Sequence, residues 1–179
     1  MDTTKPETVY EGRFLRVAKR GSWEYATRAK ATGVVCVVAM HDDGRVVLIE
    51  QHRPPMDGSV IELPAGLAGD VDDTESLLSA ARRELEEETG YTAEAWFRLP
   101  TVCTSPGLTD EAMTFFLARG LRRTGSGGGV GSESIRVHEV PLDEVPAWLE
   151  AAAAKGRHTA GTLLAGLYAA SVHTQRDTG

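Results

Sequence analysis

Apolar segments separated by turn residues predict a chain rich in β-strands. Residues 9–18 and 23–28 read as two strands around a turn at residues 19–22, so the N-terminal segment resembles a hairpin. Residues 34–40 are all apolar, and residues 45–51 resume after a short polar turn, which predicts a second, buried hairpin. Further strands are expected at residues 61–63, 96–103, 113–118 and 135–140.

One helix is predicted from the spacing of its apolar residues. Leucine and alanine recur at helical spacing from Leu77 to Leu85, and Gly90 is suited to the left-handed conformation that ends many helices. Asp72 followed by Glu75 makes a capping box, in which each side chain binds a free backbone N–H of the first turn. This box predicts a helix that starts near residue 73 and runs for about four turns.

The C-terminal third predicts two more helices after a glycine-rich segment. Residues 122–134 contain enough glycine to form a mobile loop, or else a short linker. Residues 145–154 predict a helix with Pro146 in its first turn, and residues 159–172 a closing helix. Too little chain follows the glycine-rich segment for a second domain.

These elements together indicate an α/β fold of the α+β kind. Strands that alternate with a central and a terminal helix fit an α/β/α sandwich around a mixed β-sheet, with an extra N-terminal antiparallel strand pair. We expect a single domain over residues 1–179, in which residues 1–30 hold the strand pair and residues 31–179 form the core of the domain.

Composition restricts the partners and the compartment. The chain has 179 residues, 41% of them hydrophobic, and no apolar run approaches the roughly 18 residues that span a bilayer. The first residues lack a signal pattern, and Cys36 and Cys103 stand isolated, so we expect a cytoplasmic protein. A net charge of −7 argues against nucleic-acid and anionic-membrane partners. A phosphorylated small molecule remains admissible if metal ions supply positive charge.

Three glutamates of the predicted helix face the same space. At about 100° per residue, Glu88 lies near +40° and Glu87 near −60° from Glu84. Like charges at this spacing destabilise a helix by roughly 0.2–0.5 kcal/mol per pair. These three glutamates form either a solvated acidic face or a site for a hard cation. A cation site is possible because Mg²⁺ and Mn²⁺ prefer carboxylate and phosphate oxygens.

The helix and the loop before it resemble the Nudix box, G-x5-E-x7-R-E-U-x-E-E-x-G-U, in which U is a bulky apolar residue. The matching residues are Gly69, Glu75, Arg83, Glu84, Leu85, Glu87, Glu88, Gly90 and Tyr91. In many relatives the box opens at the glycine of a Pro-Ala-Gly turn, here Gly66, so the first glycine is either Gly66 or Gly69.

The resemblance implies a metal-dependent hydrolase of a nucleoside diphosphate linked to another group. Glu84, Glu87, Glu88 and the carbonyl of Ala65 would hold Mg²⁺, with Mn²⁺ as a possible substitute. Arg83 would orient Glu87, since residues one turn apart on a helix are neighbours. Glu75 fits a helix cap better than a metal ligand.

A second motif narrows the substrate. Residues 104–111, TSPGLTDE, place Pro106 fifteen residues after Tyr91, and Nudix enzymes that hydrolyse ADP-ribose are similar here. An ordinary Pro-Gly turn is the alternative. The resemblance implies hydrolysis of ADP-ribose to AMP and ribose 5-phosphate. Another sugar nucleotide such as GDP-mannose, a dinucleotide, and a non-catalytic nucleotide sensor are the other possibilities.

Several residues are candidates for binding this substrate. The substrate would contact Pro106, Gly107 and Leu108. Leu67 either lines the substrate pocket or packs in the core. Arg53 fits the pyrophosphate or a surface salt bridge, and Glu62 fits a ribose hydroxyl or a loop cap. Trp23 and Tyr25 fit adenine stacking, although packing is commoner for aromatic residues on strands.

The general base and the oligomeric state are also inferred from the resemblance. Glu133, on the glycine-rich segment, matches the place of a glutamate that takes a proton from the attacking water, and Glu139 and Glu111 are lesser candidates. In similar enzymes the N-terminal segment crosses into a partner subunit, so we expect a homodimer.

Overall fold

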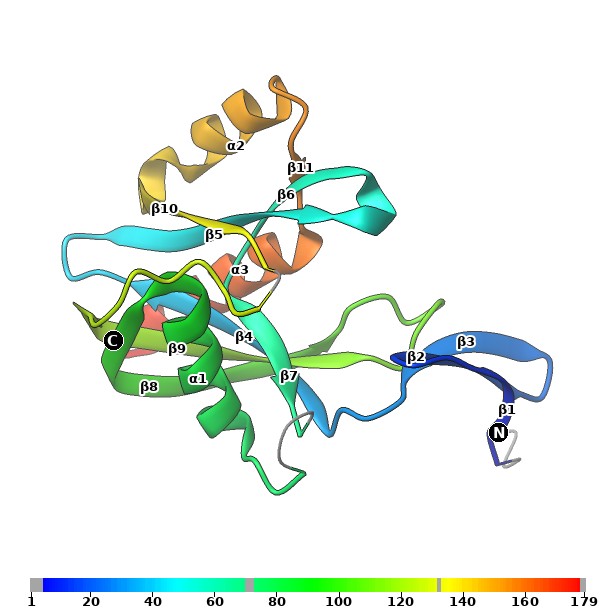
Figure 1. The fold of residues 1–179 in the computed structure, drawn as a ribbon. Helices are drawn as coiled ribbons and strands as arrows, with labels where there is room; N and C mark the ends of the chain where they lie inside the picture. Colours follow the sequence, from blue (N-terminus) through cyan, green and yellow to red (C-terminus); the bar gives the residue numbers. More distant parts are fainter. Residues whose placement is uncertain (1–4, 70–72, 132, 178–179) are drawn as a thin grey trace.

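The chain folds into two β-sheets and three α-helices within the residues that the computed structural model describes, 5–69, 73–131 and 133–177. The smaller sheet contains β1 (Glu7–Glu11), β2 (Leu15–Arg20) and β3 (Trp23–Arg28), which pair antiparallel in that order. It projects to one side of the larger sheet (Figure 1).

The N-terminal sheet corrects the expected strand pair. Residues 9–18 were predicted as one strand, but the chain turns back on itself, where the amide of Gly12 donates to the carbonyl of Leu15 at 2.8 Å. Three strands therefore replace two. Large apolar side chains remain exposed on this sheet, namely those of Val9, Tyr10, Phe14, Leu15 and Trp23.

The larger sheet is mixed, as expected. Its strands run in the order β11 (His158–Thr159), β6 (Gly58–Glu62), β5 (Arg45–Arg53), β4 (Gly33–Met40), β9 (Ala112–Arg123) and β8 (Tyr91–Cys103). β10 (Ile135–Pro141) pairs with β5, and β7 (Ala65–Ala68) pairs with β4. The β4–β9 and β6–β11 pairs are parallel, and the other pairs are antiparallel.

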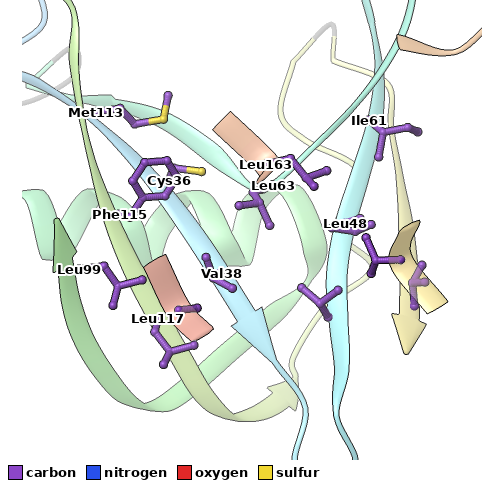
Figure 2. Close-up of a cluster of buried hydrophobic side chains, with 14 of the residues drawn as sticks. Cys36, Val38, Leu48, Ile61, Leu63, Leu99, Met113, Phe115, Leu117 and Leu163 are labelled. Atoms are coloured by element: carbon purple, nitrogen blue, oxygen red, sulfur yellow. The ribbon is translucent and has the colours of Figure 1, made fainter. Parts of the chain in front are cut away.

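Alternating residues of β4 divide the core into two layers. Val35, Val37 and Ala39 pack with the apolar face of α1 (Leu77–Thr89), which includes Leu85. Val34, Cys36 and Val38 pack on the opposite face, where α3 (Gly161–Asp177) contributes Leu163 (Figure 2). The period of two in a strand produces this division. The arrangement confirms the predicted α/β/α sandwich.

The central helix starts later than expected. α1 begins after Ser76, whose hydroxyl accepts from the amide of Ser79 at 3.1 Å, so the predicted start near residue 73 is wrong. Asp72 lies outside the described residues. Glu75 does not cap the helix, because both of its carboxylate oxygens accept from Arg83. Gly90 ends the helix at φ 73°, as predicted.

The other predicted elements lie near their expected positions, whereas β7, β11 and the 3₁₀ helices were not predicted. α2 (Val145–Ala153) has Pro146 in its first turn, and α3 extends a few residues beyond the expected end. β8 starts directly after α1, and β9 continues to Arg123, so both strands are longer than predicted. Two short 3₁₀ helices, η1 (Pro54–Met56) and η2 (Leu142–Glu144), complete the fold. Among the described residues, no helix is long and apolar enough to cross a membrane.

Candidate active site

The start of β7 contacts the end of the acidic helix. The amide of Ala65 donates to the Glu88 carboxylate at 2.9 Å, and Glu88 is only 4% exposed. Gly66 faces Glu84 so closely that an added Cβ would lie 2.0 Å from its carboxyl carbon. Gly69 instead packs against Thr32 with φ 78°. Gly66 is therefore the glycine that lets the strand approach the carboxylates.

Arg83 binds three glutamates at once. Its guanidinium donates to Glu75 at 3.1 Å, to Glu84 at 2.9 Å and to Glu87 at 3.2 Å, and also to the carbonyl of Leu67 at 2.9 Å. The hydrogen bonds to Glu75, followed by the charge of Glu84, raise the pKa of Arg83 above its ordinary value. The planar guanidinium thus orients the carboxylates on one side of the helix.

Burial raises the pKa of Glu88 to about 8. The amide of Ala65 and the charge of Arg53 oppose this shift, whereas the charges of Glu84 and Glu133 add to it. A cation bound nearby would favour the charged form of Glu88 and so lower its pKa. The donor set is oxygen-rich and suits a hard divalent ion.

The carboxylates are not arranged as ligands. Among the described residues, no three His, Cys, Asp or Glu side chains converge closely enough to hold a metal ion. Glu84 and Glu87 turn toward Arg83, and Glu88 turns toward the Ala65 amide. The carboxylate oxygens suit a metal ion chemically, but these side chains would have to reorient to bind one.

Two predicted substrate residues bind each other. Arg53 donates to Glu62 at 2.7 Å, and Gln51 donates to the same carboxylate at 2.9 Å. The charge of Arg53 lowers the pKa of Glu88, so this pair lies within electrostatic reach of the acidic helix. The side chain of Leu67 packs against the core, while its carbonyl accepts from Arg83.

The loop that contains Pro106, Gly107 and Leu108 lies elsewhere. It joins β8 to β9 and docks on β3, where the amide of Ala26 donates to the carbonyl of Leu108 at 2.8 Å. A cavity of about 390 Å³ lies there, lined by Arg20, Trp23, Tyr25, Pro106, Thr109 and Asp110. The loop and the C-terminal end of α1 lie on opposite sides of β7 (Figure 1). One chain does not bring them together.

The three candidate bases differ in their partners. Glu133 is exposed and accepts from the amide of Val130 at 2.8 Å, and its charge reaches Glu88. Glu139 accepts from the hydroxyl of Tyr91 and from Arg45. Glu111 forms a 2.7 Å ion pair with Arg28. Of these, Glu133 is the carboxylate that lies beside the acidic helix.

Two features of the site were not anticipated. The binding of Glu75 to Arg83 was not predicted, although their fixed spacing in the box was a possible signal. Nor was the contact of the glycine-rich segment with α1, in which the amides of Gly128 and Gly129 donate to the carbonyls of Glu88 and Glu87.

The fold and the site define a class of α/β/α domains in which a glutamate-rich helix packs beside a mixed sheet. The chain belongs to the NUDIX family, since the family model of the NUDIX domain matches residues 29–160. Nudix hydrolases generally need divalent metal ions.

Individual relatives agree with this assignment. The chain is 32% identical over 149 residues to the methanol dehydrogenase activator of Bacillus methanolicus, a match that covers 79% of each protein. It is 40% identical over 92 residues to the ADP-ribose pyrophosphatase of Bacillus subtilis (strain 168), covering 51% of this chain and 48% of that protein. The corresponding enzyme of Mycobacterium tuberculosis is 43% identical over 93 residues, covering 52% of this chain and 44% of that protein. The chain thus spans about half the length of these two pyrophosphatases.

A solved structure shares the fold. The crystal structure of an ADP compounds hydrolase superposes with a TM-score of 0.73 and 21% sequence identity, covering 97% of this chain and 93% of that one.

Proposed function

We propose that the chain is a pyrophosphohydrolase that cleaves ADP-ribose to AMP and ribose 5-phosphate. The observation that carries the proposal is the buried Glu88, placed with Glu84, Glu87 and Arg83 beside the Ala65 turn in a member of the NUDIX family. Relatives named ADP-ribose pyrophosphatase make ADP-ribose the first substrate to test.

Mg²⁺ is the proposed cofactor, with Mn²⁺ as a substitute. Glu84, Glu87, Glu88 and the carbonyl of Ala65 would hold it, because hard cations prefer oxygen ligands. Bound there, such an ion would neutralise the diphosphate and lower the pKa of a nearby water. Arg83 donates to one oxygen each of Glu84 and Glu87, so after the side chains reorient the other oxygen of each carboxylate would meet the ion while the guanidinium keeps its hydrogen bonds.

Other side chains of the site bind substrate and accept the proton. Arg53 uses part of its guanidinium on Glu62, and its remaining N–H groups suit the pyrophosphate. Glu62 accepts from a ribose hydroxyl while its second oxygen stays with Arg53, and Leu67 lines the pocket. Glu133, exposed and near Glu88, takes the proton of the attacking water.

We further propose that two copies complete each site. Within one chain, Pro106, Gly107 and Leu108 lie with the N-terminal sheet and apart from α1. The exposed apolar side chains of that sheet suit an interface with a second copy. A homodimer would bring this loop to the partner's α1, with Trp23 and Tyr25 stacking the adenine.

We also propose that residues 1–179 form one catalytic unit that acts in the cytoplasm. The buried thiol of Cys36 and the isolated, exposed Cys103 suit a reducing compartment. A small nucleotide sugar is the proposed partner, rather than nucleic acid or membrane, because the net charge is −7.

The test is hydrolysis of a substrate panel. Purified protein with Mg²⁺ is given ADP-ribose, GDP-mannose and a dinucleotide, and AMP and ribose 5-phosphate are identified after the reaction. Glu84→Gln and Glu88→Gln should each lose about 10³-fold or more in kcat. Glu86→Gln, an exposed neighbour on the same helix, is the matched control. Full activity in the Glu88 variant would refute the assignment, and preference for GDP-mannose would change the substrate.

A further inference from the structure

The glycine-rich segment caps the C-terminal end of α1. The amides of Thr124 and Gly125 donate to the carbonyl of Gly90 at 2.8 and 3.1 Å. The amide of Gly128 donates to the Glu88 carbonyl at 2.9 Å, and that of Gly129 to the Glu87 carbonyl at 3.0 Å. The last carbonyls of a helix have no partner within it, so the segment supplies hydrogen bonds that the helix lacks. Figure 1 shows it running beside this end of α1.

Two glycines of this segment lie where an added side chain would clash with its neighbours. Gly127 has φ 65°, and a Cβ there would lie 2.4 Å from the carbonyl carbon of Thr89 and 2.7 Å from the amide nitrogen of Gly90. Those neighbours are backbone atoms, so the segment itself would have to move. Gly129 has φ 84°, and its Cβ would lie 2.6 Å from both Cβ and Oε2 of Glu133.

The same segment fixes Glu133. Its Oε2 accepts from the amide of Val130 at 2.8 Å, and its own amide donates to the carbonyl of Val130 at 3.2 Å. A short path of hydrogen bonds therefore leads from the carbonyl of Glu87 through Gly129 and Val130 to the carboxylate of Glu133.

We propose that Gly127 and Gly129 are positioning residues that set the place of the Glu133 carboxylate relative to Glu87 and Glu88 during hydrolysis. This inference rests on the function proposed above. Gly127 lets the segment reach the helix, and Gly129 leaves space for Glu133 to fold against it. A displacement of about 1 Å at a catalytic group can cost about 10²-fold in rate, so the effect falls on kcat.

Gly131 provides a matched control for Gly127. Its φ is 64°, and no atom lies within 4 Å of an added Cβ. Gly127→Ala and Gly131→Ala therefore share the backbone strain, and they differ in the contact with α1. We expect Gly127→Ala to lose about tenfold or more in kcat with KM changed less than about threefold, while Gly131→Ala stays within about threefold of wild type in both.

A double-mutant cycle separates positioning from a general loss of structure. In a Glu133→Ala background, Gly127→Ala should cause little further loss of kcat, because the group that it positions is absent. Additive losses would overturn the inference. Gly129→Ala is the second variant, since the atoms nearest its added methyl group belong to the side chains of Glu133 and Ile135, whereas those nearest the methyl group of Gly127→Ala belong to the backbone of α1 and Gly90. It keeps the test decisive if Gly127→Ala does not fold.

The outcomes also separate this inference from the proposed function. An active wild-type enzyme whose kcat is unchanged by Gly127→Ala and Gly129→Ala overturns the positioning role alone. A wild-type protein that cleaves no member of the panel overturns the proposed function, and this role with it.

Discussion

Glu88 on α1 accepts a 2.9 Å hydrogen bond from the backbone amide of Ala65, at the start of β7. This bond joins the first residue of β7 to the end of α1 and fixes the direction of a buried carboxylate. An amide supplies only a partial positive charge, so the cost of burying Glu88 is not offset in the protein alone.

The first prediction concerns the stability of the metal-free protein. Glu88 keeps its proton up to about pH 8 in the folded state, whereas the ordinary pKa is 4.5. The folded state therefore binds more protons than the unfolded chain between these values, and the free energy of unfolding should fall as pH rises through this window. In chelator, urea unfolding at a series of pH values should show a loss of up to about 1.4 kcal/mol per pH unit across this window.

Glu88→Gln should remove most of that pH dependence, because glutamine stays neutral and still accepts from Ala65. Glu86→Gln, whose side chain is exposed, should retain the wild-type slope. A wild-type stability that is flat or rises over this range would contradict the prediction.

The second prediction concerns Arg83. Arg83→Ala leaves Glu75, Glu84 and Glu87 without their shared partner, and we expect a loss of about 2 kcal/mol in stability together with a fall in kcat. Arg83→Lys should recover little, since an ammonium group lacks the planar fork that binds several oxygens. Urea unfolding and steady-state kinetics give the two readouts. Arg82→Ala, which alters an exposed neighbour, should leave kcat within about threefold of wild type.

The third prediction tests which glycine matters to the acidic helix. Gly66→Ala would place a methyl group against the Glu84 carboxylate, so Mn²⁺ binding and turnover should both fall by about 10²-fold. Gly58→Ala is the control, because the atoms nearest to an added Cβ there, in the ring of His158 and the carbonyl of Met56, lie at the ordinary contact distances of 3.4–3.6 Å. Titration with Mn²⁺ and the hydrolysis assay measure the difference. Equal losses in the two variants would refute the special role of Gly66.

The sequence predicted most of the sandwich, because its signals are local. The apolar run at residues 34–40 and the spacing from Leu77 to Leu85 depend on near neighbours, and both elements formed as expected. The predicted start of α1 was wrong because Glu75 binds Arg83, eight residues away, and Ser76 caps the helix instead. Local pattern rules do not include such a competition between partners.

The glycine-rich segment shows the same limit. Its composition predicted mobility, yet its amides bind carbonyls of α1 from a distance of about forty residues along the chain. The turn after β1 was missed for a related reason, since only the pairing of β1 with β2 shows that the chain reverses there. The candidate carboxylates were predicted as a group, but their partners depend on contacts between β7 and α1.

The last prediction tests whether two chains share each site. If the N-terminal sheet of one copy completes the partner's site, a Trp23→Ala/Tyr25→Ala variant should raise KM for ADP-ribose by about tenfold. This variant and Glu88→Gln each carry one defective half of the composite site. In a mixed dimer both defects fall on the same site and leave the other intact, so mixing two nearly inactive proteins at low substrate should restore about a quarter of wild-type activity. Tyr168→Ala, which alters an exposed tyrosine on α3, should leave KM unchanged. A monomer of 19.2 kDa in light scattering, or a mixture no more active than its components, would show that each chain binds substrate alone.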